Sequence, residues 1–431
     1  MDKLTILLAD YLPLANKGEE AILRGIQDMF GGPEAVETCI FTHTEHAGRV
    51  DDINVFPVEW GFRIAGRLLT WRQRTWRRVL SCLGQRLGFY GRAWRMARSR
   101  HPRFEPLRSY FDRCHLVLVG HDAMFSPETC AMIHVAHAAG KPVGILGAGF
   151  ELNRRMRPFA VPVYRKAVEE SRFVVLRERR TLRLLREISG SEKLRLAPDP
   201  AFAMAPAPAD ETSAYLNRVG FLQTARERGR PVVLVTVCEK SVAFRASFRR
   251  CTGLDAKRDA HVRFVARLLD GLIRERGASV MFLPHAIEPG IGNDVEVARR
   301  IRAQMASPQH HHWILEDDVS PRLLKGIIAT ADFLVGERTH SLIGAVDVGT
   351  PFVALTNTTD GRTHDIIGDM SESANEIIDM DAPDVLRASR TVLSAFERRE
   401  DLRKKLRDVA KRHRAELAGV AESIRAQVPN G

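Results

Sequence analysis

The 431-residue sequence has no apolar stretch that approaches the length of a membrane-spanning helix. Such a helix needs about 18 consecutive apolar residues, whereas the first apolar run, residues 4–9, ends at Asp10. This run is also shorter than the apolar region of a secretory signal peptide, which spans about 7–15 residues. We therefore expect a cytoplasmic protein.

Cysteines are few and scattered. The chain has six, and no two have the Cys-x-x-Cys spacing that marks zinc knuckles or redox centres. The run His310-His311-His312 is a second candidate for metal binding, but no other ligand motif lies near it. The sequence therefore predicts neither a disulfide framework nor a metal site.

Acidic residues are absent from residues 60–104, which contain twelve arginines and no lysine. These twelve charges equal the formal net charge of +12, so the rest of the chain is neutral on balance. Four of the five tryptophans lie in this segment, and its apolar residues recur near helical spacing. The segment therefore predicts a basic amphipathic helical insert.

Three interpretations of the basic insert remain open. The helix packs on its own domain with a solvated basic face, or it contacts the anionic inner face of the cytoplasmic membrane or a lipid-linked substrate. Nucleic acid is the third partner, but no nucleic-acid-binding motif accompanies the charge. We therefore do not expect nucleic-acid binding.

Apolar runs of strand length alternate with helical patterns in both halves of the chain. This alternation is typical of an open parallel sheet. The expected strands are residues 4–9, 38–41, 116–119, 142–146, 173–176 and 195–197, and then 232–237, 279–283, 313–315, 333–336 and 352–355.

A Pro/Ala-rich stretch, residues 205–212, separates the two runs and is a linker candidate. We therefore predict an α/β fold with two Rossmann-like domains, residues 1–207 and 208–386, and a helical tail, residues 387–431. The N-terminal domain would carry the basic insert. A binding cleft is expected between the two domains.

A polar corner follows the apolar run that ends at Gly336. Glu337, Arg338 and His340 come directly before a helical pattern. In parallel sheets, ligands lie beyond the carboxyl ends of the strands, where a helix N-terminus favours anions. An arginine fork suits a carboxylate or phosphate, and a histidine adds a donor that also carries a proton. The corner therefore predicts a site for a small polyanion.

Three similar corners occur in the first half of the sequence. They contain Gly18 with Glu20, His121 with Asp122, and Arg177. Each alone is a weak signal, since helix starts often carry polar residues for capping. Arg177 and the Arg338 corner come from different halves of the sequence, so we expect them to bind one dianion from two sides.

Six motifs in this order resemble those of the polysaccharide pyruvyltransferases. Residues 16–22 resemble the family's Asn-x-Gly-Asp-Glu-Ala-Ile, and residues 199–202 match its Asp-Pro-Ala-Phe. Residues 338–343 resemble its Arg-x-His-x-x-Ile. The other matches are the glycine-containing turns at residues 120–125 and 144–149, and Arg177-Glu178 with Thr181.

This resemblance implies a GT-B-like fold and a transferase that uses phosphoenolpyruvate as its donor, without a further cofactor. The acceptor would be a saccharide precursor of a cell-surface polysaccharide or exopolysaccharide, free or lipid-linked, and the product a pyruvate ketal. Carried over by position, Arg177, Arg338 and His340 would bind the donor. Gly18 and Glu337 are further candidates for substrate binding.

Ketal formation also needs a carboxylate that takes the hydroxyl proton and a group that protonates carbon. His340 suits proton transfer, and Glu20, Asp122, Asp199 and Glu337 are the candidate bases, which the sequence does not rank. Two other functions remain open. One is a sugar-nucleotide-dependent GT-B glycosyltransferase, in which Glu337 would bind ribose, and the other is a non-catalytic polysaccharide-assembly protein.

Overall fold

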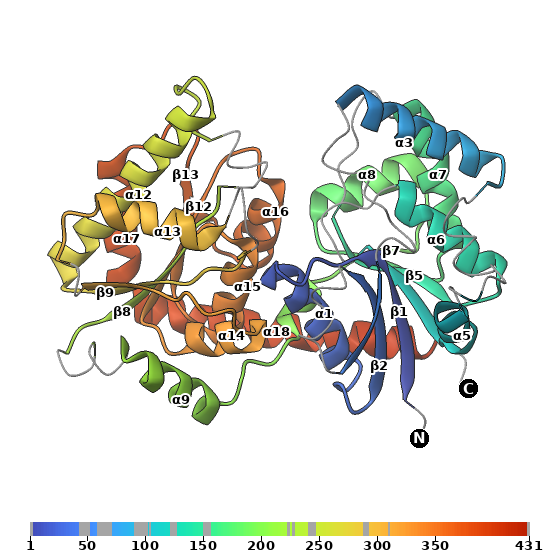
Figure 1. The fold of residues 1–431 in the computed structure, drawn as a ribbon, viewed down its shortest axis with the longest axis horizontal. Helices are drawn as coiled ribbons and strands as arrows, with labels where there is room; N and C mark the ends of the chain where they lie inside the picture. The colour runs from blue at the N-terminus through green and yellow to red at the C-terminus, as the bar shows by residue number, and fades with distance from the viewer. Residues whose placement is uncertain are drawn as a thin grey trace. The chain divides into compact units, whose positions relative to one another are not determined.

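The computed structural model describes residues 3–42, 52–57, 71–89, 102, 105–120, 127–149, 157–221, 225, 229–239, 247–287, 293–308 and 311–428. The chain forms two compact units, each around its own parallel sheet (Figure 1). Unit 1 comprises Met1–Leu14, Ile22–Ala203 and Ala415–Gly431. Unit 2 comprises Ala15–Ala21 and Met204–Arg414.

Unit 1 contains a seven-stranded sheet in the order β3-β2-β1-β4-β5-β6-β7, with all neighbours parallel. The strands are β1 (Leu4–Tyr11), β2 (Val36–Thr42), β3 (Ile53–Pro57), β4 (Leu116–Val119), β5 (Val143–Ala148), β6 (Val174–Leu176) and β7 (Leu194–Leu196). The helices are α1 (Lys17–Met29), which begins in unit 2, α3 (Trp71–Arg86), α5 (Glu105–Arg113), α6 (Pro127–Ala138), α7 (Arg157–Glu170), α8 (Arg179–Ser189) and the short helix η3 (Pro200–Phe202).

The core of unit 1 lies between one face of its sheet and the helices α5, α6, α7 and α8. Leu7, Phe41 and Val117 on the sheet belong to one buried apolar cluster with Tyr110 of α5 and Ile133 of α6. Strands covered on both faces read as continuous apolar runs, and β4 and β5 are buried at every residue. This is why the sequence revealed them.

Unit 2 contains a six-stranded parallel sheet in the order β10-β9-β8-β11-β12-β13. The strands are β8 (Val232–Thr236), β9 (Ser279–Phe282), β10 (His312–Ile314), β11 (Phe333–Gly336), β12 (Phe352–Thr356) and β13 (Ile377–Asp379). The longer helices are α9 (Ala209–Val219), α12 (Leu254–Arg276), α13 (Asp294–Gln304), α14 (Pro321–Ala329), α15 (Thr339–Val348), α17 (Val385–Glu397) and α18 (Arg399–Arg425). Short helices are α16 (Gly361–Thr363), η5 (His364–Met370) and η6 (Ala374–Glu376).

Helices α12, α13 and α17 cover one face of the unit 2 sheet. Val235, Phe333 and Val353 form a buried cluster with Val265 of α12 and Val392 of α17. Helices α14 and α15 pack on each other, and α15 contacts β11 and β12. The carboxyl ends of β8, β9 and β11 lie side by side in this sheet because β8 pairs with both neighbours.

The units differ from the predicted domains at both ends of the chain. The division falls at Ala203/Met204 rather than at residue 207, and Ala15–Ala21 belongs to unit 2. The predicted tail is not a separate part, because α17 packs on α12 and β12, and α18 continues from unit 2 into unit 1. The sequence also missed β3 and β13, each of which forms one edge of its sheet, although it located β7 and β10 at the opposite edges.

In the part of the chain that the structure describes, every helix is too short or too polar to span a lipid bilayer.

Candidate functional site

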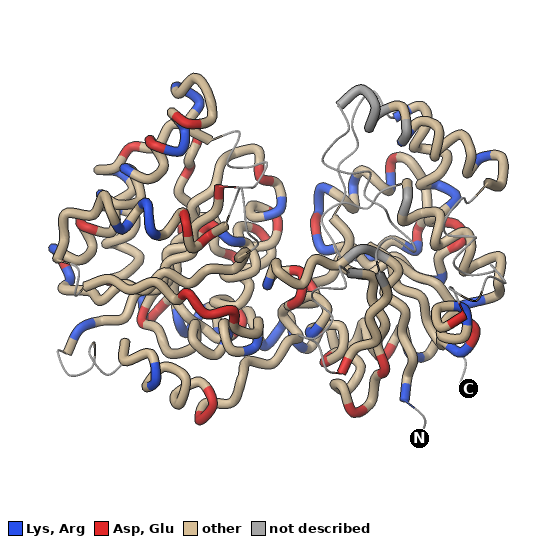
Figure 2. Tube along the Cα trace, in the orientation of Figure 1, with Lys and Arg blue, Asp and Glu red and all other residues tan. Residues whose placement is uncertain are grey.

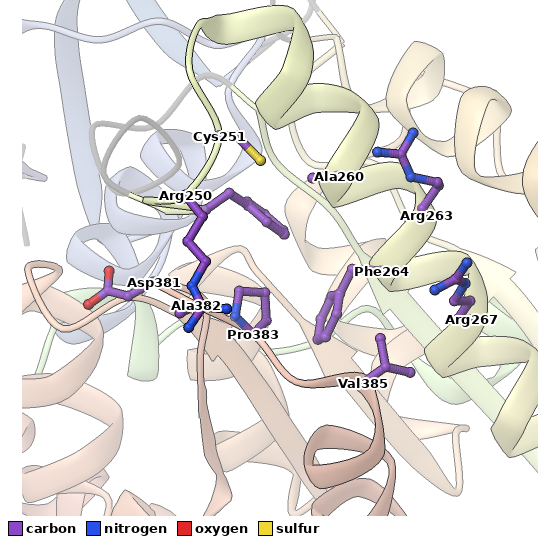
Figure 3. A pocket seen from close by; sticks show the side chains of 11 residues that line it. Arg250, Cys251, Ala260, Arg263, Phe264, Arg267, Asp381, Ala382, Pro383 and Val385 are labelled. Carbon is purple, nitrogen blue, oxygen red and sulfur yellow. The ribbon is translucent and has the colours of Figure 1, made fainter.

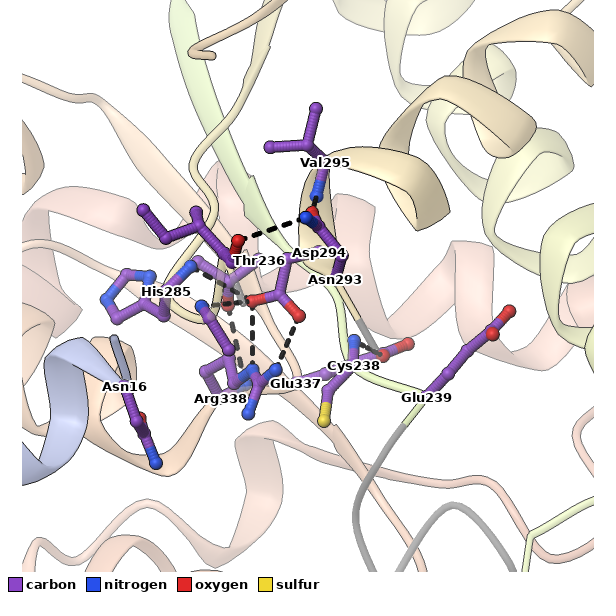
Figure 4. Close-up of polar contacts among 12 residues, drawn as sticks. Asn16, Thr236, Cys238, Glu239, His285, Asn293, Asp294, Val295, Glu337 and Arg338 are labelled. Carbon is purple, nitrogen blue, oxygen red and sulfur yellow. Dashed lines mark hydrogen bonds and ion pairs between the residues drawn. The ribbon is translucent and has the colours of Figure 1, made fainter. Parts of the chain in front are cut away.

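Three segments of unit 2 meet at the carboxyl end of its sheet. The segment Ala15–Ala21 forms an antiparallel bridge between Asn16 and Ala286, just after β9. The Lys17 amide donates to the carbonyl of His285 at 2.8 Å. The corner that contains Arg338 follows β11 and lies beside both segments (Figure 4). We call Lys17, Glu20, His285, Asp294, Arg338 and His340 the polar cluster.

Arg338 is fixed by a carboxylate at the first position of α13. Its Nε donates to Oδ2 of Asp294 at 3.0 Å, and its Nη2 donates to Oδ1, a fork-like pairing (Figure 4). Asp294 is fully buried and also accepts from the amides of His285 and Ala286, each at 2.9 Å. Arg338 keeps 17% of its side chain exposed. Asp294 thus holds the guanidinium in place, while part of the Arg338 side chain reaches the surface.

The charge of Arg338 is stabilised although its surroundings are largely buried. Burial alone would lower its pKa, but the Asp294 carboxylate outweighs burial and raises the pKa above its usual value. Arg338 also stands at the N-cap of α15, where the helix dipole favours anions. The guanidinium is therefore a permanent, pre-oriented cation at a position suited to a carboxylate or phosphate.

His340 lies against the backbone of Gly18. A Cβ atom at position 18 would lie 2.3 Å from Nδ1 of the His340 ring, closer than real Cβ atoms come to any neighbour. The Gly18 amide donates to Oδ1 of Asn16 at 3.1 Å, which caps the first turn of α1. Glycine is thus needed at this position to admit the imidazole.

We expect Gly18→Ala to displace His340 and to lower any turnover that depends on this ring by about 100-fold, the loss that a misplacement of about 1 Å can cause. The neighbour that must move is a side chain, so the loss in unfolding free energy should stay near 1 kcal/mol. Steady-state kinetics and thermal unfolding measure the two effects.

Gly25→Ala is the matched control for a steric clash elsewhere on α1. Its Cβ would lie 2.0 Å from the Pro200 carbonyl, which belongs to the backbone of unit 1. This variant should lose stability while its folded fraction keeps its activity. Full activity of Gly18→Ala would show that the position of His340 does not matter for the reaction.

Lys17 and His285 complete the polar cluster. The buried Lys17 ammonium lies 3.3 Å from Oε2 of Glu20 and 2.8 Å from Oδ1 of Asp318. Burial lowers the pKa of His285 to about 4, so this histidine is neutral at pH 7. Its Nδ1 lies 3.0 Å from the Leu283 carbonyl, which identifies Nδ1 as the protonated nitrogen.

Glu337 points away from the polar cluster. Its Oε1 lies 2.6 Å from Nε2 of His261 on α12, and its Oε2 accepts from the Cys238 amide at 2.7 Å. Burial would lower the pKa of His261, but the Glu337 carboxylate outweighs this effect and raises it. Both carboxylate oxygens of Glu337 therefore tie α12 and the end of β8 to the corner.

Arg177 and Asp199 form a buried ion pair in unit 1. Nη1 of Arg177 lies 2.6 Å from Oδ2 of Asp199, and both side chains are fully buried. Oδ1 of Asp199 accepts from the Ala201 amide at 2.9 Å and caps η3. The pair thus holds the turn before Pro200. Asp122, another sequence candidate, lies outside the described residues.

Residues 16–359 of the chain match the family model described as "Polysaccharide pyruvyl transferase". The chain belongs to the polysaccharide pyruvyl transferase family. No curated protein sequence matches it.

Solved structures of other activities share its fold. A putative UDP-N-acetylglucosamine 2-epimerase from Listeria monocytogenes superposes with a TM-score of 0.54 at 11% identity, over 99% of this chain and 97% of that one. The UDP-GlcNAc 2-epimerase of Neisseria meningitidis gives 0.53 at 11% identity, over 98% and 100%. The glycosyltransferase VinC, solved with DTDP, gives 0.51 at 13% identity, over 99% and 100%. The fold is therefore GT-B-like with two Rossmann-like domains, as the sequence predicted.

In this pyruvyl transferase family member, some motif segments contribute to the polar cluster and others to packing within unit 1. The segments at 16–20 and 338–340 build the polar cluster in unit 2. In unit 1, two motif segments, residues 144–149 and 199–202, meet at Pro200. Gly25 faces the Pro200 carbonyl, and a Cβ at Gly147, whose φ is +72°, would lie 2.8 Å from the Pro200 ring.

The sequence missed Lys17, His285 and Asp294 as members of the cluster. His285 follows β9 as His340 follows β11, so the rule that polar residues follow strand ends would have found it. Asp294 resembles an ordinary acidic residue in the first turn of a helix. Only the folded chain shows that it is buried beneath Arg338.

Two other features of unit 2 lie outside the polar cluster. His311 and His312, from the histidine run, are engaged with Arg230 and Arg302 respectively. A surface pocket of about 250 Å³ lies between the middle of α12, the segment that precedes this helix and the segment that leads into α17 (Figure 3). Its lining is Phe248, Arg250, Cys251, Ala260, Arg263, Phe264, Arg267, Asp381, Ala382, Pro383 and Val385, none of which belongs to the cluster.

Proposed function

We propose that the protein transfers the enolpyruvyl group of phosphoenolpyruvate to a sugar of a cell-surface polysaccharide or exopolysaccharide precursor, where it forms a pyruvate ketal. The observation that carries this proposal is Arg338, a partly exposed side chain whose guanidinium is held by Asp294 beside His340, in a chain of the pyruvyl transferase family. A donor with a carboxylate and a phosphate matches such a cation better than a neutral sugar does.

The reaction joins two hydroxyl oxygens of one sugar to C2 of the enolpyruvyl group. When the first hydroxyl oxygen bonds to C2, it loses its proton, and the methylene carbon gains one and becomes a methyl group. The second hydroxyl oxygen replaces phosphate at C2, and its proton leaves with the inorganic phosphate. The protein must therefore bind two anionic groups, supply a proton to carbon and accept protons from hydroxyls.

We assign anion binding to Arg338, because its guanidinium is fixed by Asp294 and stays charged. His340 is assigned to proton transfer or to a hydrogen bond with phosphate. Its ring is positioned by Gly18, which thus serves substrate binding indirectly.

Among the candidate bases in the described residues, Glu20 is the one in the polar cluster. Its carboxylate lies 3.3 Å from the Lys17 ammonium. Asp199 is paired with Arg177 and Glu337 with His261, which supports a positioning role for both carboxylates. We therefore propose that Glu20 accepts the hydroxyl proton. Arg177 and Glu337 are proposed to position the surrounding structure.

Thermal shift with phosphoenolpyruvate, compared with UDP- and GDP-sugars, tests this function. A ligand at about 100 times its dissociation constant stabilises the folded state by about 2.7 kcal/mol, which raises Tm by several degrees. We expect phosphoenolpyruvate to do so and the sugar nucleotides to have no effect. Stabilisation by a sugar nucleotide alone would identify a glycosyltransferase, and no effect of any donor would favour a non-catalytic role.

A further inference from the structure

One side of α3 exposes a continuous apolar stripe. Trp76, Leu80 and Leu83 follow one another at intervals of four and three residues, and Leu87 follows four residues later in the turn that ends the helix. Side chains at these intervals lie on one helix face. Trp76 is 67% exposed, Leu80 62% and Leu87 75%, and the nearby Phe89 is 72% exposed. Few large apolar side chains elsewhere in the described residues are so exposed.

A different side of α3 holds the helix on its own domain. Val79 and Cys82 are buried in the core cluster of unit 1, and α3 contacts α6 and α7. Gln85 donates through Nε2 to the Pro127 carbonyl at 2.6 Å. Packing on the domain thus accounts for Val79, Cys82 and Gln85. A helix packed in this way normally presents polar residues to water, so packing does not account for the stripe.

The charge of α3 fits an anionic surface. The helix sequence contains five arginines and no acid, and Arg78 and Arg86 are exposed. Figure 2 shows basic and no acidic positions on the part of α3 that it colours. A surface that combines arginines with exposed tryptophan and leucine suits the headgroup region of an anionic bilayer, where apolar side chains insert beneath the charged groups.

We propose that the stripe Trp76-Leu80-Leu83-Leu87 of α3 docks this protein on an anionic lipid surface. The leucines and tryptophan enter the headgroup boundary, and the flanking arginines pair with lipid phosphates. Nucleic acid would pair with the arginines but would leave the apolar stripe in water, so the lipid surface accounts for both features. The inference does not depend on the reaction that the polar cluster performs.

Co-sedimentation with vesicles tests the inference on the full-length protein without any substrate. We compare pure phosphatidylcholine with phosphatidylcholine mixed with phosphatidylglycerol. The wild type should bind the mixed vesicles at about 50 mM salt and be released at about 500 mM, since surface charges are screened over a few ångströms there. Leu80→Ser/Leu87→Ser should lose at least about tenfold in partitioning. Arg78→Glu/Arg86→Glu should lose a comparable amount.

Leu386→Ser is the matched control, because Leu386 is as exposed as Leu87 but lies on α17 in unit 2. It should bind like the wild type. The altered side chains are exposed, so Tm should stay unchanged, and the two double variants probe the surface independently. Equal binding to both vesicle types, no binding to either, or wild-type binding by both double variants would overturn the inference. A dimer that Leu80→Ser/Leu87→Ser dissociates would also overturn it, because the stripe would then bind a second copy.

Discussion

Replacing Arg338 by alanine should weaken phosphoenolpyruvate binding by about 10- to 150-fold. The change removes the charged donor that would bind the anionic ligand, and a hydrogen bond from such a donor contributes about 1.5–3 kcal/mol. It also leaves the buried Asp294 carboxylate without its cation. Isothermal titration calorimetry measures the affinity, and thermal unfolding measures the accompanying loss of stability.

Two further variants separate the ligand from the fold. Arg338→Lys keeps the charge but loses the planar fork that pairs with Asp294, so it should restore part of the affinity. Asp294→Asn keeps Arg338 and removes the charge that fixes it, and should therefore weaken binding less than Arg338→Ala. Unchanged affinity in Arg338→Ala would exclude this residue from the donor site.

Replacing Arg177 by leucine should destabilise the protein by about 3–5 kcal/mol, because Asp199 is left as an uncompensated buried charge. Both partners of this pair are fully buried. Thermal unfolding of the protein, followed in the absence and presence of phosphoenolpyruvate, measures the effect. At a temperature where the variant is folded, its affinity for phosphoenolpyruvate should equal that of the wild type.

The double variant Arg177→Leu/Asp199→Asn is the control. Asparagine removes the buried charge but keeps an Oδ1 acceptor for the Ala201 amide. It should recover much of the lost stability. If Arg177→Leu is as stable as the wild type but no longer binds phosphoenolpyruvate, Arg177 is a donor-binding residue and its pairing with Asp199 is secondary.

The sequence located most strands of the sheets because central parallel strands are apolar on both faces. Residues 116–119 and 279–283 were expected as strands and agree with β4 and β9 to within one residue. It located the edge strands β7 and β10 but missed β3 and β13. Strand β13 has only three residues, one of them buried, and ends in the exposed Asp379, so it lacks a continuous apolar run. The apolar strand also located the Arg338 corner, because a polar residue directly after a buried parallel strand lies at the carboxyl end of the sheet.

By itself, then, the sequence determined two parallel α/β halves, a polar corner at the end of β11, and a basic amphipathic α3. It did not determine which charges meet. Tertiary structure placed Ala15–Ala21 in unit 2, with Gly18 against His340, and buried Asp294 beneath Arg338. It also buried Arg177 against Asp199. These pairings join residues far apart in the chain, and apolar periodicity carries no information about strand order or about which carboxylate reaches which cation.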